Sequence, residues 1–174
     1  MKKLFAVVMT LCLLVSAAAL AEQAAVKEIT WASMEETAAK IEGKFAEIGG
    51  TGVKMYIPST FIDSEITEER KNEGDFLLLK TKEENAVVSG QVVKADIDAF
   101  KATLPENGAT GVEDVVINGL HATMFNVVKS GILATCIAIG TDQGSVMLLS
   151  FAPADQEPFT ETYRVMVASL QHNQ

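Results

Sequence analysis

Residues 111–152 read GVEDVVINGLHATMFNVVKSGILATCIAIGTDQGSVMLLSFA, and this stretch gives the clearest indication of the fold. It contains apolar runs of strand length that are rich in β-branched residues, separated by short turns. Each turn contains a glycine, as in Asn118-Gly119, and such turns favour tight chain reversals between neighbouring strands. The pattern therefore predicts an antiparallel meander, with strands at residues 112–117, 120–128, 132–139 and 145–152.

The central hairpin of this meander also predicts a register. If Ser130-Gly131 forms a two-residue turn, Phe125 lies opposite Cys136 and Val127 lies opposite Ala134. Both faces of the sheet are then apolar, so we expect helices to cover both of them. One face carries Phe125, Val127, Ile132, Ala134 and Cys136, and the other carries Met124, Val128, Leu133, Ile137 and Ile139.

Alternating apolar residues before the meander predict two further hairpins. The first joins residues 44–48 to 53–57 through Gly49-Gly50-Thr51-Gly52, and the second joins 75–81 to 86–93. The glycine-rich turn lacks the lysine and the following helix of a phosphate-binding loop, so a flexible hairpin turn is the better interpretation.

Three helices are predicted from caps and from helical spacing. Ser33 and Glu36 form a capping-box pattern that begins a helix over residues 33–42. Asp96 can cap a second helix that ends before Pro105. Asp155 can cap a third, whose apolar face holds Phe159, Tyr163, Met166 and Leu170.

The first 21 residues predict export. Lys2 and Lys3 precede an apolar stretch at residues 4–15, and small residues end at Ala21, which is the pattern of a cleaved signal peptide. The apolar stretch is shorter than the roughly 20 residues that span a bilayer. A lipoprotein signal at Cys12 fits poorly, because Thr10 and Leu11 precede that cysteine. We therefore expect a signal peptide at 1–21, a leader at 22–30 and a single domain at 31–174, secreted or otherwise extracytoplasmic.

Composition limits the partners of the mature domain. Cleavage removes two lysines and no acidic residue, which changes the net charge from −9 to −11. Such a surface repels nucleic acid and anionic membranes, so we expect neither as a partner. Cys136 is the only cysteine left, so no intramolecular disulfide can form, and stability must come from the core.

Four segments carry a resemblance to a known fold family. They are Ile-Pro-Ser-Thr-Phe at 57–61, Val-Ile-Asn-Gly-Leu at 116–120, the glycine-led strand at 144–151 and Ala-Ser-Leu at 168–170. They resemble the PsbP-like fold, a group that includes the Ran-binding Mog protein. The resemblance covers about residues 44–171 and implies an α+β fold, with an antiparallel sheet between helices, in a family that is mostly not enzymatic. The alternative is an NTF2-like or cystatin-like cone.

No catalytic arrangement follows from the sequence. Cys136 and His121 could suggest a thiol and its base, but the register separates them by roughly 13 Å along the strands. The other histidine, His172, is expected in a frayed C-terminal tail, and no pair of residues has zinc-ligand spacing. Trp31 is interpreted as a packing residue rather than a ligand platform.

These observations favour an exported, non-enzymatic binding or interaction module. Its partner is an unknown protein or small molecule, its oligomeric state is open, and no catalytic residue, cofactor or metal ligand is assigned. One alternative is a metal-assisted hydrolase that uses carboxylates of the acidic segment 63–75, among them Asp63, Glu65 and Asp75. Another is a small-molecule carrier with an internal cavity.

Overall fold

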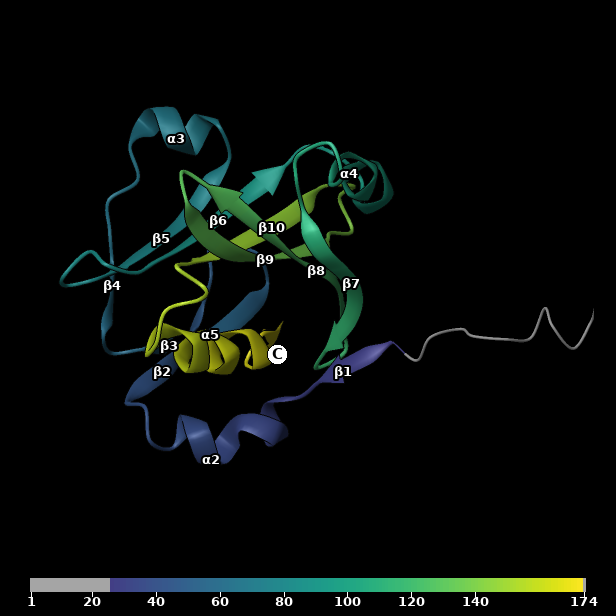
Figure 1. Ribbon diagram of the computed structural model, residues 1–174. Coiled ribbons are helices and arrows are strands. Elements are labelled where there is room, and N and C mark those ends of the chain that lie inside the picture. The colour runs from purple at the N-terminus through teal and green to yellow at the C-terminus, as the bar shows by residue number, and fades with distance from the viewer. Residues whose placement is uncertain (1–25, 174) are drawn as a thin grey trace, which may run out of the picture.

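The protein, described by a computed structural model over residues 26–173, contains two sheets (Figure 1). The larger sheet has the strand order β1-β7-β8-β9-β10-β6-β5-β4, and the smaller has the order β11-β3-β2. Neighbouring strands are antiparallel except for β1 and β7, which are parallel. The strands are β1 (Lys27–Ile29), β2 (Gly43–Glu47), β3 (Val53–Pro58), β4 (Phe61–Asp63), β5 (Asp75–Thr81), β6 (Val87–Val93), β7 (Thr110–Ile117), β8 (Leu120–Lys129), β9 (Ile132–Gly140), β10 (Val146–Ala152) and β11 (Gln171–His172).

The meander and its register are confirmed. Strands β7 to β10 are neighbours in the larger sheet, and Phe125 pairs with Cys136 while Val127 pairs with Ala134. Ser130 and Gly131 both have positive φ, at 53° and 78°, which matches the twist that a two-residue hairpin turn requires. The two earlier hairpins also form, as β2–β3 in the smaller sheet and β5–β6 in the larger.

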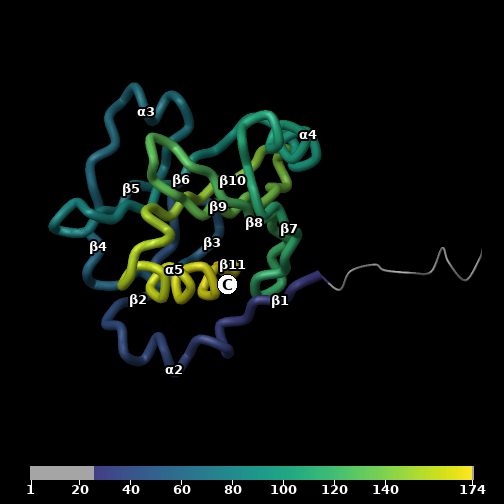
Figure 2. The backbone as a smooth tube through the Cα atoms, in the orientation of Figure 1, coloured from purple at the N-terminus to yellow at the C-terminus, as the bar shows by residue number. Residues whose placement is uncertain are grey.

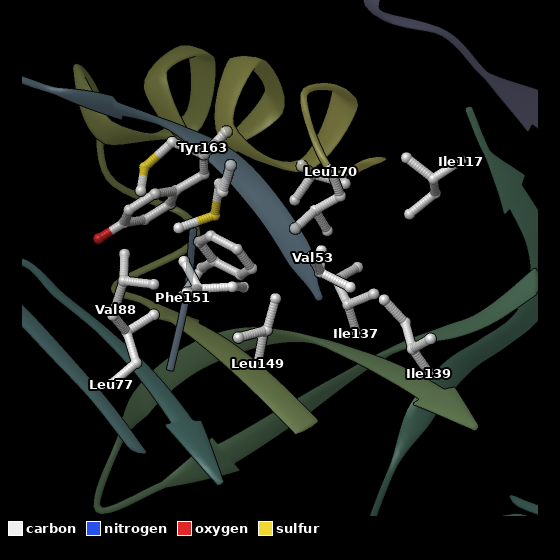
Figure 3. Close-up of a cluster of buried hydrophobic side chains, with 14 of the residues drawn as sticks. Val53, Leu77, Val88, Ile117, Ile137, Ile139, Leu149, Phe151, Tyr163 and Leu170 are labelled. Atoms are coloured by element: carbon white, nitrogen blue, oxygen red, sulfur yellow. The ribbon is translucent and has the colours of Figure 1, made fainter. Parts of the chain in front are cut away.

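The two faces of the larger sheet are both apolar, as predicted, but they are covered differently. One face packs on α5 (Phe159–Ala168) and on β3 of the smaller sheet. Figure 3 shows Phe151 pointing from β10 toward Tyr163 of α5, and their ring centroids are 5.5 Å apart. The opposite face carries the short helix α4 (Ile97–Thr103) over Phe125 and Cys136. Ile132 on that face is 53% exposed, so α4 covers only part of it.

The predicted helix over residues 33–42 is much shorter in the structure. A 3-10 turn, η1 (Trp31–Met34), leads into one turn of α2 (Glu35–Ala38). The capping box does not form, because the Ser33 hydroxyl donates a hydrogen bond back to the Thr30 carbonyl oxygen over 2.6 Å. The residue before α2 is Met34, which caps no amide with its side chain.

Of the other two predicted helix caps, the one at Asp96 forms and the one at Asp155 does not. The Asp96 carboxylate accepts a hydrogen bond from the Ala99 amide over 2.8 Å and caps α4, as predicted. Asp155 does not cap α5, because that helix begins later, with Pro158 at its N-cap position. One helix was not predicted, α3 (Glu68–Asn72), which lies in the acidic segment and is capped by Thr67.

Both ends of the described chain join sheets. The expected leader overlaps β1, which pairs with residues Val115 to Ile117 of β7, so this part belongs to the larger sheet. His172 lies in β11 and pairs with Val53, so the C-terminal end is not frayed, and Figure 2 shows it beside α5. The expected signal peptide at 1–21 lies outside the described residues. Within residues 26–173, every helix is too short or too polar to cross a membrane.

Candidate functional site

A cleft of about 490 Å³ lies between the larger sheet, α5 and the β1–η1 segment. Its floor is made by Met124 of β8, Thr135 of β9 and Phe151 of β10. Thr135 pairs with Phe151 across β9 and β10, and Met124 lies diagonally across the β8–β9 ladder, so the three side chains share one face of the sheet. The floor is therefore a continuous and mainly apolar part of the sheet surface.

Helix α5 forms one wall of this cleft. Its lining residues recur at i, i+3, i+4, i+7 and i+8, so they lie on a single face of the helix. Tyr163 is 4% exposed, and its hydroxyl donates a hydrogen bond to the Ala152 carbonyl oxygen over 2.7 Å. Burial raises the pKa of the Tyr163 hydroxyl well above its usual range. The lining residues of α5 are Thr160, Tyr163, Arg164, Val167 and Ala168.

The opposite wall is the β1–η1 segment, and Asn118 ties it to α5. The Asn118 side-chain oxygen accepts a hydrogen bond from the Trp31 amide over 2.8 Å. The Asn118 side-chain nitrogen donates to the carbonyl oxygens of Ala168, over 2.7 Å, and Leu170, over 2.9 Å. The sequence indicated Asn118 only as a turn residue, and the Asn-Gly pair carries no signal of these longer-range bonds. The wall residues on this side are Lys27, Ile29, Ser33 and Met34.

The hydroxyl hydrogens of the cleft are used within the protein. Ser33 donates to the Thr30 carbonyl oxygen over 2.6 Å. Thr135 donates to the Asn126 side-chain oxygen over 2.9 Å, and Thr160 donates to the Ala154 carbonyl oxygen over 3.1 Å. Because a hydroxyl has one hydrogen, these groups can only accept further hydrogen bonds. The charged side chains that line the cleft, among the described residues, are Lys27 and Arg164.

A second cleft, of about 520 Å³, lies beside α4 and is more polar. The Lys101 ammonium group contacts both carboxylate oxygens of Asp114, at 2.8 and 2.7 Å, and the Thr123 hydroxyl donates to Asp114 over 2.8 Å. The hydrogen bond from Lys101, with that from Thr123, holds the pKa of the Asp114 carboxyl below its usual range. Lys101, Asp114 and Thr123 therefore satisfy one another, while the carboxylates of Asp98 and Asp142 also line this cleft.

The structure does not bring His121 and Cys136 together as a thiol–imidazole pair. His121 lies at the second cleft and is exposed, whereas Cys136 is 3% exposed and pairs with Phe125, four residues away along β8. The sulfur of Cys136 lies 3.3 Å from the Ser150 hydroxyl oxygen. Burial raises the pKa of the Cys136 thiol, so this side chain packs as a small core residue.

Two carboxylates of the acidic segment, Glu68 and Asp75, form ion pairs with neighbouring cations. Asp75 lies 2.6 Å from the Arg70 guanidinium nitrogen, and Glu68 lies 2.7 Å from the Lys71 ammonium nitrogen. Across residues 26–173, no cluster of three or more histidine, cysteine, aspartate or glutamate side chains has the arrangement of a metal site. The metal-assisted hydrolase hypothesis therefore has no ligand cluster to support it in this part of the chain.

Trp31 is a packing residue, as predicted. Its ring centroid lies 5.1 Å from that of Phe45 and 5.5 Å from that of Tyr56. The Phe45 and Tyr56 rings also meet edge to face, at 5.5 Å. This aromatic group joins η1 to the β2–β3 hairpin and so supports the wall of the first cleft.

Comparison with known proteins shows the fold. No protein-family model and no curated protein matches the sequence. The solution structure of cyanobacterial PsbP (CyanoP) from Synechocystis is similar, with a TM-score of 0.54 and 9% identity over 76% of this chain and 93% of that one. The chain has a PsbP-like α+β fold, and the PsbP part of the expected resemblance is confirmed.

Two further structures resemble the chain. A protein of Bacteroides thetaiotaomicron matches with a TM-score of 0.51 and 20% identity over 77% of this chain. The match covers 50% of the Bacteroides protein, so this chain spans about half its length. LpqN, involved in cell envelope biogenesis of Mycobacterium tuberculosis, matches with a TM-score of 0.41 and 16% identity over 74% of this chain and 88% of that one.

Proposed function

We propose that this protein is an exported, non-enzymatic binding module that takes a small, largely apolar molecule into the cleft between α5, η1 and the larger sheet. One observation carries the proposal. The cleft has a volume of about 490 Å³, within the roughly 300–1,000 Å³ that is typical of small-molecule sites, and an apolar floor with polar groups at its margin.

Other features support the proposal. The signal-peptide pattern at residues 1–21 favours a place of action outside the cytoplasm. Among residues 26–173, the side chains that converge on the cleft include no nucleophile paired with a base, which favours binding over catalysis. The sequence left two classes of partner open, a protein and a small molecule. The cleft favours the small molecule.

Fluorescence titration with the neutral apolar probe phenylnaphthylamine tests the proposal. The domain without residues 1–21 should bind the probe at one site, with increased probe emission and a change in the emission of Trp31, the single tryptophan of the chain. Thr135→Phe should abolish this binding because its ring fills the cleft floor. Thr110→Phe is the matched control, since Thr110 is an exposed position on β7 outside the cleft.

A second blocking variant keeps the test independent of folding. Ser33→Phe changes an exposed residue on the opposite wall, so it should also block the cleft without disturbing the core or adding a second tryptophan. Circular dichroism should show that each variant is folded. Binding that is absent in the unchanged domain, or equally strong in both blocking variants, would overturn the proposal.

A further inference from the structure

We infer that the cleft selects single-chain amphiphiles with a carboxylate head group, which Arg164 binds with help from Lys27. This inference rests on the proposed function and names the ligand class of the same site. Few side-chain hydrogen-bond donors at the cleft remain free for a ligand. The hydroxyl hydrogens of Ser33, Thr135 and Thr160 are already donated within the protein. The side-chain donors left at the cleft, among the described residues, belong to the two cations.

Arg164 is the stronger of the two anchors. It lies on the cleft face of α5, one turn from both Thr160 and Ala168, and it is exposed. The ion pairs found among residues 26–173 do not include it. A guanidinium group presents parallel N–H donors that match the two oxygens of a carboxylate. Arg164 can therefore bind a carboxylate without giving up an existing ion pair.

Lys27 adds a second positive charge from the opposite wall. Its ammonium nitrogen lies 3.0 Å from Glu113, and the two side chains are 57% and 42% exposed. Exposed ion pairs contribute little, because water screens both charges, so Lys27 can turn toward a ligand at small cost. Glu113 does not line the cleft. The two walls thus place one cation on each side of the opening.

The charge at the cleft is opposite in sign to the charge of the chain. The whole protein carries a net charge of −9, yet the cleft lining contains two cations and, within the described residues, no carboxylate. This local reversal favours an anionic head group at the opening. Below it, Met34 of the β1–η1 wall and Met124 of the floor suit an alkyl chain, because methionine side chains adapt to an irregular apolar surface.

Three probes with the same alkyl chain test the inference: decanoate, decanol and decylamine, each used below its micelle-forming concentration. Binding is measured by Trp31 fluorescence and by calorimetry at low ionic strength. Decanoate should bind on the order of tenfold more tightly than decanol, and decylamine more weakly than decanol. Added salt should reduce the preference for decanoate, because it screens the two cations.

Charge-removing variants identify the anchor. Arg164→Gln should lower the affinity for decanoate to about that for decanol and change the affinity for decanol far less. Lys27→Gln should act in the same direction with a smaller effect. Lys82→Gln is the control, because it removes one positive charge from the exposed β5–β6 turn, away from the cleft. Folding of each variant is checked by its melting temperature.

The outcomes separate this inference from the proposed function. Equal affinity for all three probes, or decanoate binding that Arg164→Gln leaves intact, would overturn the head-group assignment while the binding function stands. Failure of every probe, together with failure of phenylnaphthylamine, would overturn both. A decanoate preference that Arg164→Gln removes and Lys82→Gln retains would support the inference.

Discussion

The side-chain oxygen of Asn118 lies 2.8 Å from the backbone nitrogen of Trp31 and accepts its hydrogen bond. The same side chain donates to the Ala168 and Leu170 carbonyl oxygens at the end of α5. One residue in the β7–β8 turn thus joins the start of η1 to the end of α5. Because those two segments form opposite walls of the first cleft, Asn118 holds the cleft at its observed width.

Replacing Asn118 should destabilise the domain by two separable effects. Asn118→Ala loses three hydrogen bonds and places an alanine at φ 45°, so we expect a loss of about 2–4 kcal/mol. Asn118→Gly loses the same bonds but tolerates the left-handed backbone, so it should be about 1 kcal/mol less destabilised. Urea denaturation measures both changes. A glycine variant as stable as the unchanged domain would show that these hydrogen bonds add nothing.

Tyr163 should make the domain sensitive to alkaline pH. The pKa of an unfolded tyrosine is about 10, and burial raises the pKa of Tyr163 in the folded state. The folded protein therefore holds the Tyr163 proton more tightly than the unfolded chain does. The free energy of unfolding keeps its full value below about pH 10 and falls as the pH rises above it. Tyr163→Phe should reduce that alkaline loss, while costing about 1 kcal/mol at neutral pH through the lost bond to Ala152.

The second tyrosine provides a control for this measurement. Tyr56→Phe removes a similar hydrogen bond, from the Tyr56 hydroxyl to the Ile41 carbonyl oxygen over 2.7 Å. It also leaves Tyr163 as the only tyrosine, so tyrosinate absorbance then reports Tyr163 alone. We expect that absorbance to appear together with unfolding. Ionisation near pH 10 in a domain that stays folded would contradict the assignment.

Cys136 should be unreactive in the folded domain. Its side chain is buried and its thiol pKa is raised, so little reactive thiolate forms. A thiol-specific reagent should label the domain without residues 1–21 slowly, and quickly after denaturation. Ser59→Cys supplies an exposed cysteine as the positive control. A strong reductant should leave the melting temperature unchanged. Rapid labelling of the folded domain at Cys136 would show that the thiol is accessible.

Divalent cations should not stabilise the domain through its acidic segment. Asp75 already pairs with Arg70, and no three ligand groups converge within residues 26–173. Calcium or zinc should therefore shift the melting temperature equally little in the unchanged domain and in the triple variant Asp63→Asn, Glu65→Gln, Asp75→Asn. A clear shift that the triple variant loses would instead favour the metal-assisted hydrolase.

Local patterns in the sequence predicted much of the sheet. Ser130-Gly131 set the register of the β8–β9 hairpin, and the alternating residues around it set which side chains share a face. These features depend on neighbours a few residues apart, so a single sequence carries them. The cap at Asp96 was predicted for the same reason, whereas Asp155 was misassigned because α5 begins only after Pro158.

The cleft could not be predicted from local sequence, because its parts come from distant regions of the chain. The spacing of Phe159, Tyr163, Met166 and Leu170 predicted the apolar face of α5. It did not predict that Arg164 would lie across a cleft from Lys27. Strand β1 is too short to have a pattern of its own and gains its hydrogen bonds only by pairing with β7. Local sequence patterns were enough to predict the hairpins, the register of β8 with β9 and the turn at Asn118. What that asparagine binds and where a cleft remains follow from the folded arrangement alone, since both depend on packing between segments far apart in the chain.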